Sequence, residues 1–156
     1  MEKLTLMDYQ SLAEFRYRIR CYLHFSENVA RHSGLEPRQY QLMLLLKGLP
    51  PGARPRVGEL AERLKVQHHS AVELVNRLAA GGYVRRRRSS QDRREVLLAL
   101  TPKGERVLAA LVSHHRAELF QAGPALLAAL RRVMISLKGP RHSMAKSSSQ
   151  SGRGSK

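Results

Sequence analysis

A dense group of arginines is the part of the sequence whose chemistry is most readily interpreted. Four consecutive arginines at 85–88 are followed, after a short polar segment, by two more at 93 and 94. Cations at this density repel one another unless an anion lies nearby. Guanidinium groups form forked hydrogen bonds with phosphates and insert into narrow minor grooves of DNA. Arg86, Arg88 and Arg94 are therefore candidate contacts to a polyanion.

One acid lies inside this basic group. Asp92 stands two residues before Arg94, close enough for its carboxylate to hold the Arg94 guanidinium by a charge-assisted hydrogen bond. Such a contact reduces the entropy that the arginine loses when it binds an anion. We therefore expect Asp92 to orient Arg94, and we expect Arg94 to make the best contact of the group.

A second group of polar residues precedes the arginines and has helical spacing. His69, Glu73 and Asn76 fall on one face of an expected helix, whereas Ala71 and Val75 fall on the opposite face. An α-helix fits the major groove of B-form DNA, where such side chains can read base edges. The candidate contacts from this segment are Gln67, His68, His69, Ser70, Glu73, Asn76 and Arg77.

The composition also favours a polyanionic partner. The 156 residues include 28 Lys and Arg against 12 Asp and Glu, a formal net charge of +16. Such a field attracts nucleic acid or an anionic membrane surface. The length fits one domain with a terminal arm. No apolar stretch approaches the roughly 20 residues that cross a bilayer, and the chain opens without a signal-peptide pattern. We expect a cytoplasmic protein that does not contact a membrane.

Apolar periodicity predicts the elements that position these residues. The expected helices cover residues 8–31, a buried segment from Pro37 to Leu46, residues 57–64, and a segment that follows a short break at 65–67. On the first of them, Leu12, Phe15 and Ile19 fall on the apolar face. The third and fourth helices flank a tight turn, so the polar face of the fourth is held next to the third.

A β-hairpin follows the fourth helix and carries the arginines. Strand-compatible residues at 83–88 and 95–101 flank a polar centre at 89–92. Residues 103–137 return to helical spacing, as two expected helices separated at Gly123-Pro124. Residues 138–156 lose all periodicity and are rich in Ser, Gly, Lys and Arg, so we expect a basic disordered tail.

Helix, tight turn, helix and basic hairpin in this order form a winged helix-turn-helix, a mainly α fold with a small β-hairpin wing. Three strings resemble the MarR family of transcriptional regulators in order and spacing. They are Val57-Gly-Glu-Leu-Ala-Glu-Arg-Leu64, Leu78-Ala-Ala-Gly-Gly-Tyr-Val-Arg85, and Asp92-Arg-Arg94 followed by Leu100-Thr-Pro-Lys-Gly104.

The resemblance implies a domain organisation. Residues 1–34 and 102–137 would form a helical dimerisation region, and residues 35–101 the winged DNA-binding domain. The resemblance implies a homodimer whose two winged domains bind a pseudo-palindrome in double-stranded DNA. The apolar stripes at 8–31 and 103–137 favour a homodimer as well, because one small winged domain cannot cover them.

The resemblance also implies a ligand-responsive repressor, which releases DNA when a small molecule binds between the dimerisation helices and the winged domains. Phe15, Tyr22, Tyr40 and Met43 are the candidate lining of such a pocket. Packing in the core is the alternative role for each of these four side chains, and we favour it.

Two further groups have alternative interpretations. Cys21 is the single cysteine, and it is either an oxidant sensor or, as we favour, a buried or interfacial structural residue. His114 and Glu118 have the i, i+4 spacing of zinc ligands, with His115 beside them. That spacing alone is weak evidence, so we favour surface or interface histidines and expect neither a metal nor a cofactor.

The sequence contains no nucleophile elbow, phosphate loop, H-E-x-x-H zinc motif or separated pair of catalytic carboxylates, so we do not expect an enzyme. The favoured function is a sequence-specific DNA-binding regulator. The alternative is a basic architectural protein that coats nucleic acid without sequence preference. Competition between random duplex and genomic fragments at physiological salt separates the two functions.

Overall fold

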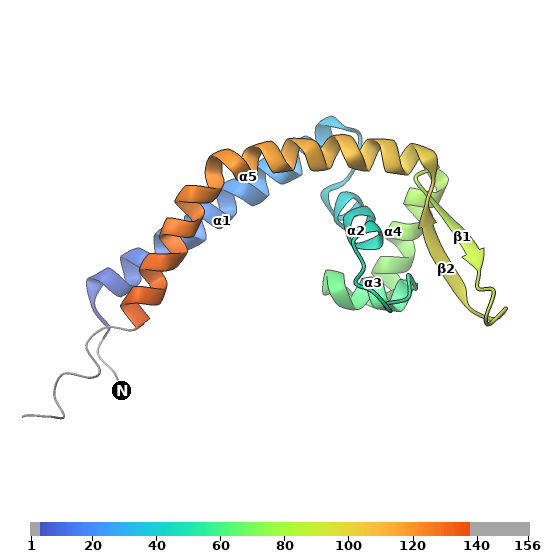
Figure 1. Cartoon of the computed structure of the whole chain (residues 1–156), viewed down its shortest axis with the longest axis horizontal. Coiled ribbons are helices and arrows are strands. Elements are labelled where there is room, and N and C mark those ends of the chain that lie inside the picture. Colours follow the sequence, from blue (N-terminus) through green and yellow to red (C-terminus); the bar gives the residue numbers. More distant parts are fainter. Residues whose placement is uncertain (1–3, 138–156) are drawn as a thin grey trace, which may run out of the picture. The chain divides into compact units, whose positions relative to one another are not determined.

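The computed structural model describes residues 4–137, which form helices α1 to α5 and one β-hairpin (Figure 1). They divide into two compact units. The winged unit comprises residues 22–121, and the helical unit comprises the described parts of 1–21 and 122–156. Helices α1 (Leu6–His32) and α5 (Pro102–Leu137) run through both units. The expected tail at 138–156 lies outside the described residues.

The winged unit confirms the expected order of elements. It contains α2 (Pro37–Lys47), α3 (Val57–Leu64), α4 (His68–Ala80), β1 (Val84–Arg88) and β2 (Val96–Leu100). Its core draws on α2, α3, α4, β2 and α5, because apolar side chains recur on the inner face of each. The largest fully buried side chains are Leu42, Met43, Leu60, Val75, Leu78, Leu98 and Leu111.

The turn between α3 and α4 depends on a left-handed residue. Lys65 has a φ of 55°, and its backbone N–H donates to the carbonyl of Glu62 over 3.1 Å. The next amide, of Val66, donates to the carbonyl of Ala61 over 3.1 Å. These bonds satisfy the last carbonyls of α3. The chain reverses within three residues, and α4 begins at His68 beside α3.

The hairpin is antiparallel, with Val84 opposite Leu100 and Arg88 opposite Val96. At its loop end, the N–H of Ser89 donates to the carbonyl of Glu95 over 3.0 Å. Strand β2 also has a neighbour on its other side, since the N–H of Leu98 donates to the carbonyl of Pro55 over 2.8 Å. The loop before α3 therefore holds the hairpin from its outer edge.

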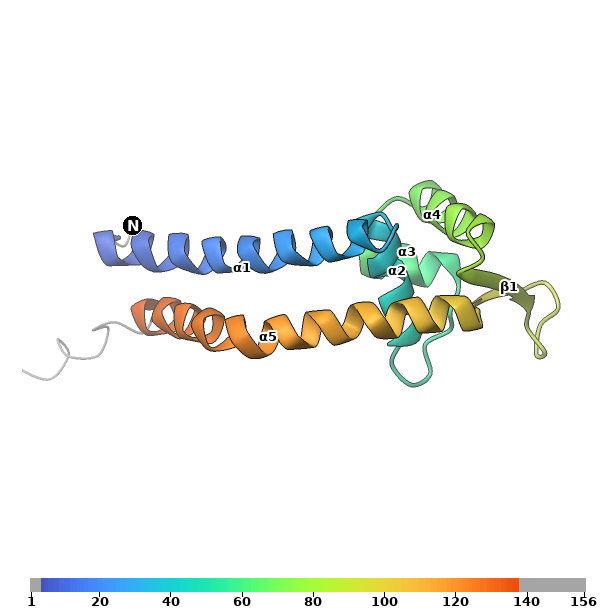
Figure 2. The same cartoon turned by 90° about the horizontal axis from the view of Figure 1, so that it is seen from above.

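The helical unit consists of the first part of α1 and the last part of α5, which run side by side (Figure 2). The Asp8 carboxylate accepts a hydrogen bond from the Ser136 hydroxyl. Ser11 and Ala129 are the only buried residues described in this unit. The sequence pattern placed Leu12 on the apolar face, but Leu12 is exposed. The neighbouring Ser11 is buried in this unit instead.

The expectation of two helices in 103–137 is wrong, because α5 continues through Pro124. A proline inside a helix removes one backbone hydrogen bond. The residues around it are mostly alanine and leucine, whose high helix propensity favours continuation. The boundary between the two units in the chain falls between Gln121 and Ala122 of this helix. Neither α5 nor any other described helix is long and apolar enough to cross a membrane.

Candidate nucleic-acid interface

The exposed face of α4 is polar, as its periodicity predicted. His69, Glu73 and Asn76 are exposed, whereas Val75 and Leu78 are buried against the core. Of the other candidates in this segment, Ser70 is half-buried, and the exposed ones are Gln67, His68 and Arg77. Gln67 is the N-cap residue and makes no side-chain capping bond. The first amides of α4 therefore lack a side-chain partner from the cap and favour an anion there.

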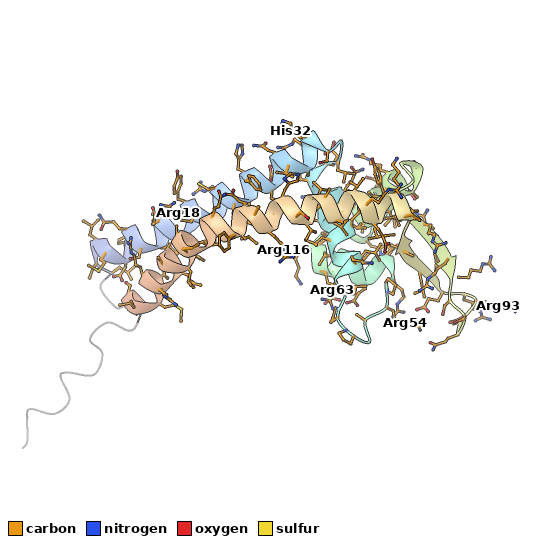
Figure 3. The ribbon with its side chains drawn as sticks, turned by 45° about the horizontal axis from the view of Figure 1, so that its top comes forward. Arg18, His32, Arg54, Arg63, Arg93 and Arg116 are labelled. Carbon is orange, nitrogen blue, oxygen red and sulfur yellow. The ribbon has the colours of Figure 1, made fainter. Side chains whose placement is uncertain are left out.

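The wing adds a basic surface beside this polar face. Four arginines of β1 are exposed, and so are Arg93 and Arg94 in the hairpin loop. Arg93 extends away from the tip of the hairpin (Figure 3). Arg86 reaches back to α4, where its Nη2 donates to the Oδ1 atom of Asn76 over 2.6 Å. This hydrogen bond joins the polar face of α4 directly to the arginines of the wing.

The expected contact between the Asp92 carboxylate and the Arg94 guanidinium is wrong. Asp92 Oδ1 instead accepts a hydrogen bond from the backbone N–H of Arg94 over 2.9 Å. Within residues 4–137, no ion pair joins the two side chains. An aspartate carboxylate reaches the amide two residues later with little loss of freedom, in an Asx turn. Asp92 therefore shapes the loop of the wing and leaves the Arg94 guanidinium exposed.

A charge cluster that local sequence patterns do not predict anchors the wing. The Glu95 side chain is only 9% exposed, and its two oxygens lie 3.0 Å from Arg54 Nη2 and 3.3 Å from Arg56 Nε. Arg54 Nη2 also donates to Gln91 Oε1 over 2.9 Å. Arg54 lies in the loop before α3 (Figure 3). The only signal for this cluster in the sequence is the Arg-Pro-Arg segment at 54–56.

A cleft of about 510 Å³ opens beside this cluster. Its walls come from the loop before α3, the start of α4 and the second half of the wing. The residues that line it include Arg56, Gly58, His68, Arg94 and Val96. Arginines from the loop before α3 and from the wing therefore line one concave part of the surface, together with the carboxylates of Asp92 and Glu95. Their guanidinium groups are the ones there that can bind a backbone phosphate of a duplex.

The Glu95 cluster leads to a first prediction. Glu95→Gln removes the charge that two guanidinium groups share, so we expect the free energy of unfolding to fall by about 2 kcal/mol. Urea denaturation measures this. The matched control is Glu105→Gln, because Glu105 pairs with Lys47 on the open surface, where an ion pair contributes little. Equal losses in the two variants would show that the Glu95 cluster does not anchor the wing.

The residues that join wing and α5 explain the third motif of the sequence. The Thr101 hydroxyl donates to the carbonyl of Gly82 over 2.6 Å, and it accepts from the N–H of Gly104 over 3.0 Å. Lys103 Nζ lies 4.4 Å from the centroid of the Tyr83 ring. Thr101 therefore caps α5 and ties its start to the turn between α4 and β1.

Comparisons with known proteins show which of them share this arrangement of helices and wing. The model of the MarR family matches residues 33–95, which run from the end of α1 into the wing. AbsC of Streptomyces coelicolor, a MarR family transcriptional regulator, has a solved structure that is similar with a TM-score of 0.65 and 21% identity. The similarity covers 90% of this chain and 100% of AbsC. A comparison with curated protein sequences finds no match.

Over residues 33–95 the chain matches the MarR family, and it has the fold of MarR family transcriptional regulators. Two further solved structures show the same similarity. A single-residue mutant of S. aureus MepR, solved bound to an oligodeoxyribonucleotide, has a TM-score of 0.59 at 18% identity, covering 86% of this chain and 99% of that one. Bordetella bronchiseptica BpsR, whose DNA binding is regulated by 6-hydroxynicotinic acid, has a TM-score of 0.57 at 17% identity, covering 80% and 90%.

The four candidate pocket residues differ in their environments. Tyr40 and Met43 are buried in the core of the winged unit, and burial raises the pKa of Tyr40 to about 12. Tyr22 is half-buried in the same unit, whereas Phe15 belongs to the helical unit. Core packing, the favoured alternative, accounts for Tyr40 and Met43.

The expectation of a surface or interface histidine is wrong for His115, which is 4% exposed. Its ring stacks on Tyr40 with centroids 4.6 Å apart. Nδ1 lies 2.6 Å from the carbonyl oxygen of Leu111 and Nε2 lies 2.7 Å from Ser26 Oγ. A carbonyl can only accept, so Nδ1 carries a hydrogen. Aromatic rings from α1 and α2 cover the His115 ring and so bury this position of α5.

Cys21 is exposed, so the expectation of a residue buried within its own chain is wrong. The half-buried residues of this turn of α1 are Ile19 and Tyr22, and Cys21 projects to the side of that face. A place in an interface between chains stays a prediction for this thiol.

Among residues 4–137, no three His, Cys, Asp or Glu side chains lie close enough together to hold a metal ion.

Proposed function

We propose that this chain is a ligand-responsive repressor of the MarR family that binds a pseudo-palindromic operator as a homodimer. The observation that carries the proposal is the exposed polar face of α4 next to a wing of exposed arginines. A helix with such a face fits a major groove, and an arginine-rich hairpin beside it fits phosphates or the adjacent minor groove. The complex of a MepR mutant with an oligodeoxyribonucleotide supports the choice of DNA as the partner.

The homodimer part of the proposal rests on the helical unit. Leu127, Leu130 and Met134 recur at i, i+3 and i+7 on α5 and are 47%, 37% and 49% exposed. The same unit buries only Ser11 and Ala129 among its described residues. Two helices with so little mutual burial need another apolar surface, and a second copy provides one by two-fold symmetry. We propose, as the family resemblance implies, that residues 1–34 and 102–137 form the dimerisation region and residues 35–101 the winged DNA-binding domain.

The ligand response is proposed because BpsR, which has the same fold, is regulated in its DNA binding by 6-hydroxynicotinic acid. A small molecule shifts the affinity for DNA only if it binds the free and the DNA-bound conformations with different affinities. For this chain the measurable form of the proposal is reciprocal: a ligand that weakens operator binding is itself bound less tightly when operator is present.

Selection of bound fragments from random duplex tests the proposal, and two variants separate base reading from phosphate binding. Asn76→Ala should cost about 1 to 3 kcal/mol at the selected sequence and hardly affect random DNA, because a base contact is lost. Arg88→Ala should weaken both DNAs and reduce the salt slope by about one ion per subunit, because a phosphate contact is lost.

Affinity measured by fluorescence anisotropy at several salt concentrations gives both quantities. If random duplex competes as well as the selected fragments at physiological salt, the chain is a basic coating protein and the repressor proposal fails. If Asn76→Ala weakens both DNAs equally, α4 lies along the backbone instead of reading bases.

A further inference from the structure

The contact between wing and recognition helix fixes how one base-reading side chain is oriented. Arg86 donates from Nη2 to Asn76 Oδ1 over 2.6 Å, with both residues exposed. A guanidinium has five donors and no acceptor. The amide of Asn76 must therefore turn its oxygen to the wing, and its Nδ2 group points away from Arg86.

That orientation limits what Asn76 can read. An asparagine recognises adenine with both ends of its amide, because Nδ2 donates to N7 while Oδ1 accepts from the N6 amino group. With Oδ1 directed at Arg86, only the N–H donors of Nδ2 are presented to a base. Guanine offers two acceptors, O6 and N7, side by side in the major groove. Adenine offers one acceptor, N7, and one donor, the N6 amino group, and this donor repels the second N–H of Nδ2.

We propose that Arg86 is a specificity-determining residue, which holds the Asn76 amide so that it favours guanine over adenine at the base pair it contacts. This inference rests on the proposed function, since it requires α4 to lie in a major groove. It gives Arg86 a role other than the polyanion contact expected from its sequence. Arg86 acts through Asn76 and is a positioning residue for base recognition.

Strand geometry supports this separate role and supplies a matched control. Side chains alternate along a strand, so Val84, Arg86 and Arg88 share one face of β1. Val84 is buried against the winged unit, so this face is the one that approaches α4. Charge-assisted hydrogen bonds are short and roughly twice as strong as neutral ones. In the described residues, the only bond from β1 arginines to an α4 side chain is that of Arg86.

The experiment is selection from random duplex with the full chain and four variants, followed by sequencing of the bound pool. Asn76→Ala identifies the position that Asn76 reads. In the parent chain we expect guanine to exceed adenine there by about fivefold or more. Arg86→Ala frees the amide to turn, so that preference should disappear or move to adenine while the other positions keep theirs.

Two further variants show that the effect belongs to the donor at position 86. Arg86→Lys retains a donor and should retain the preference for guanine, whereas Arg88→Ala removes a charge from the same strand face and should leave every base preference unchanged. Thermal melting checks that all variants fold, and we expect them to fold because the substituted side chains are exposed. Three outcomes with an enriched sequence would overturn this assignment alone. They are that no position depends on Asn76, that the position read by Asn76 prefers adenine in the parent chain, or that its preference is unchanged by Arg86→Ala. A pool with no enriched sequence would overturn the proposed function as well.

Discussion

A chain carrying both Leu127→Asp and Met134→Asp is expected to be a monomer and to bind operator about 10²–10⁴ times more weakly than the parent. The two side chains are 47% and 49% exposed on the same stripe of α5. Carboxylates on a buried apolar interface oppose association because they lose their hydration there. A monomer then binds each half-site separately and loses the high effective concentration of the second winged domain.

Sedimentation velocity measures the assembly, and anisotropy with one-half-site and two-half-site duplexes measures the loss of affinity. The matched control is Leu44→Asp, an exposed leucine of α2 that is 41% exposed and lies outside the proposed dimerisation region. It should remain a dimer. The homodimer proposal is wrong if the double variant sediments like the parent, or if the parent is already a monomer at micromolar concentration.

The second large effect is expected at Gly104, which lies in the first turn of α5 against the backbone of Tyr83. A Cβ atom there would overlap the backbone carbonyl of Tyr83, with the carbonyl carbon only 3.0 Å away. Backbone cannot move aside as a flexible side chain can, and Gly104 also donates to the capping hydroxyl of Thr101. Gly104→Ala should therefore lower the free energy of unfolding by about 3 kcal/mol.

Urea denaturation followed by circular dichroism measures that loss. Gly58→Ala is the matched control, because a Cβ atom at Gly58 meets nothing within 4 Å. In helix α3 it should leave the chain unchanged or stabilise it by up to about 1 kcal/mol through helix propensity. If the two alanine variants were equally stable, the close approach of α5 to Tyr83 would not constrain the fold.

The sequence predicts the elements of the winged unit well because each has a strong local pattern. In α4, Val75 and Leu78 are buried and Asn76 is exposed, as a period of 3.6 requires. The same reasoning failed where a partner far away in the sequence decides the outcome. Nothing near Glu95 indicates that Arg54 and Arg56 will surround it.

His115 and Asp92 show two other limits of local reasoning. His115 is polar and was expected at the surface, but Tyr22, Phe25 and Tyr40 from other elements surround its ring. The sequence predicts that Asp92 pairs with the Arg94 guanidinium, but in the turn the backbone N–H of Arg94 is the nearer partner of its carboxylate. Charge and periodicity predict which surface is basic, and they do not predict which polar groups contact one another inside it.

The discontinuous helical unit has a consequence for how the chain is made. Its contact between Asp8 and Ser136 joins residues separated by 128 positions, whereas the winged unit is one contiguous stretch, 22–121. A ribosome releases residues in order, and contiguous units generally fold as they emerge. The winged unit is therefore complete before the helical unit can close, so a nascent chain acquires its DNA-binding fold first and the surface proposed to pair two copies last.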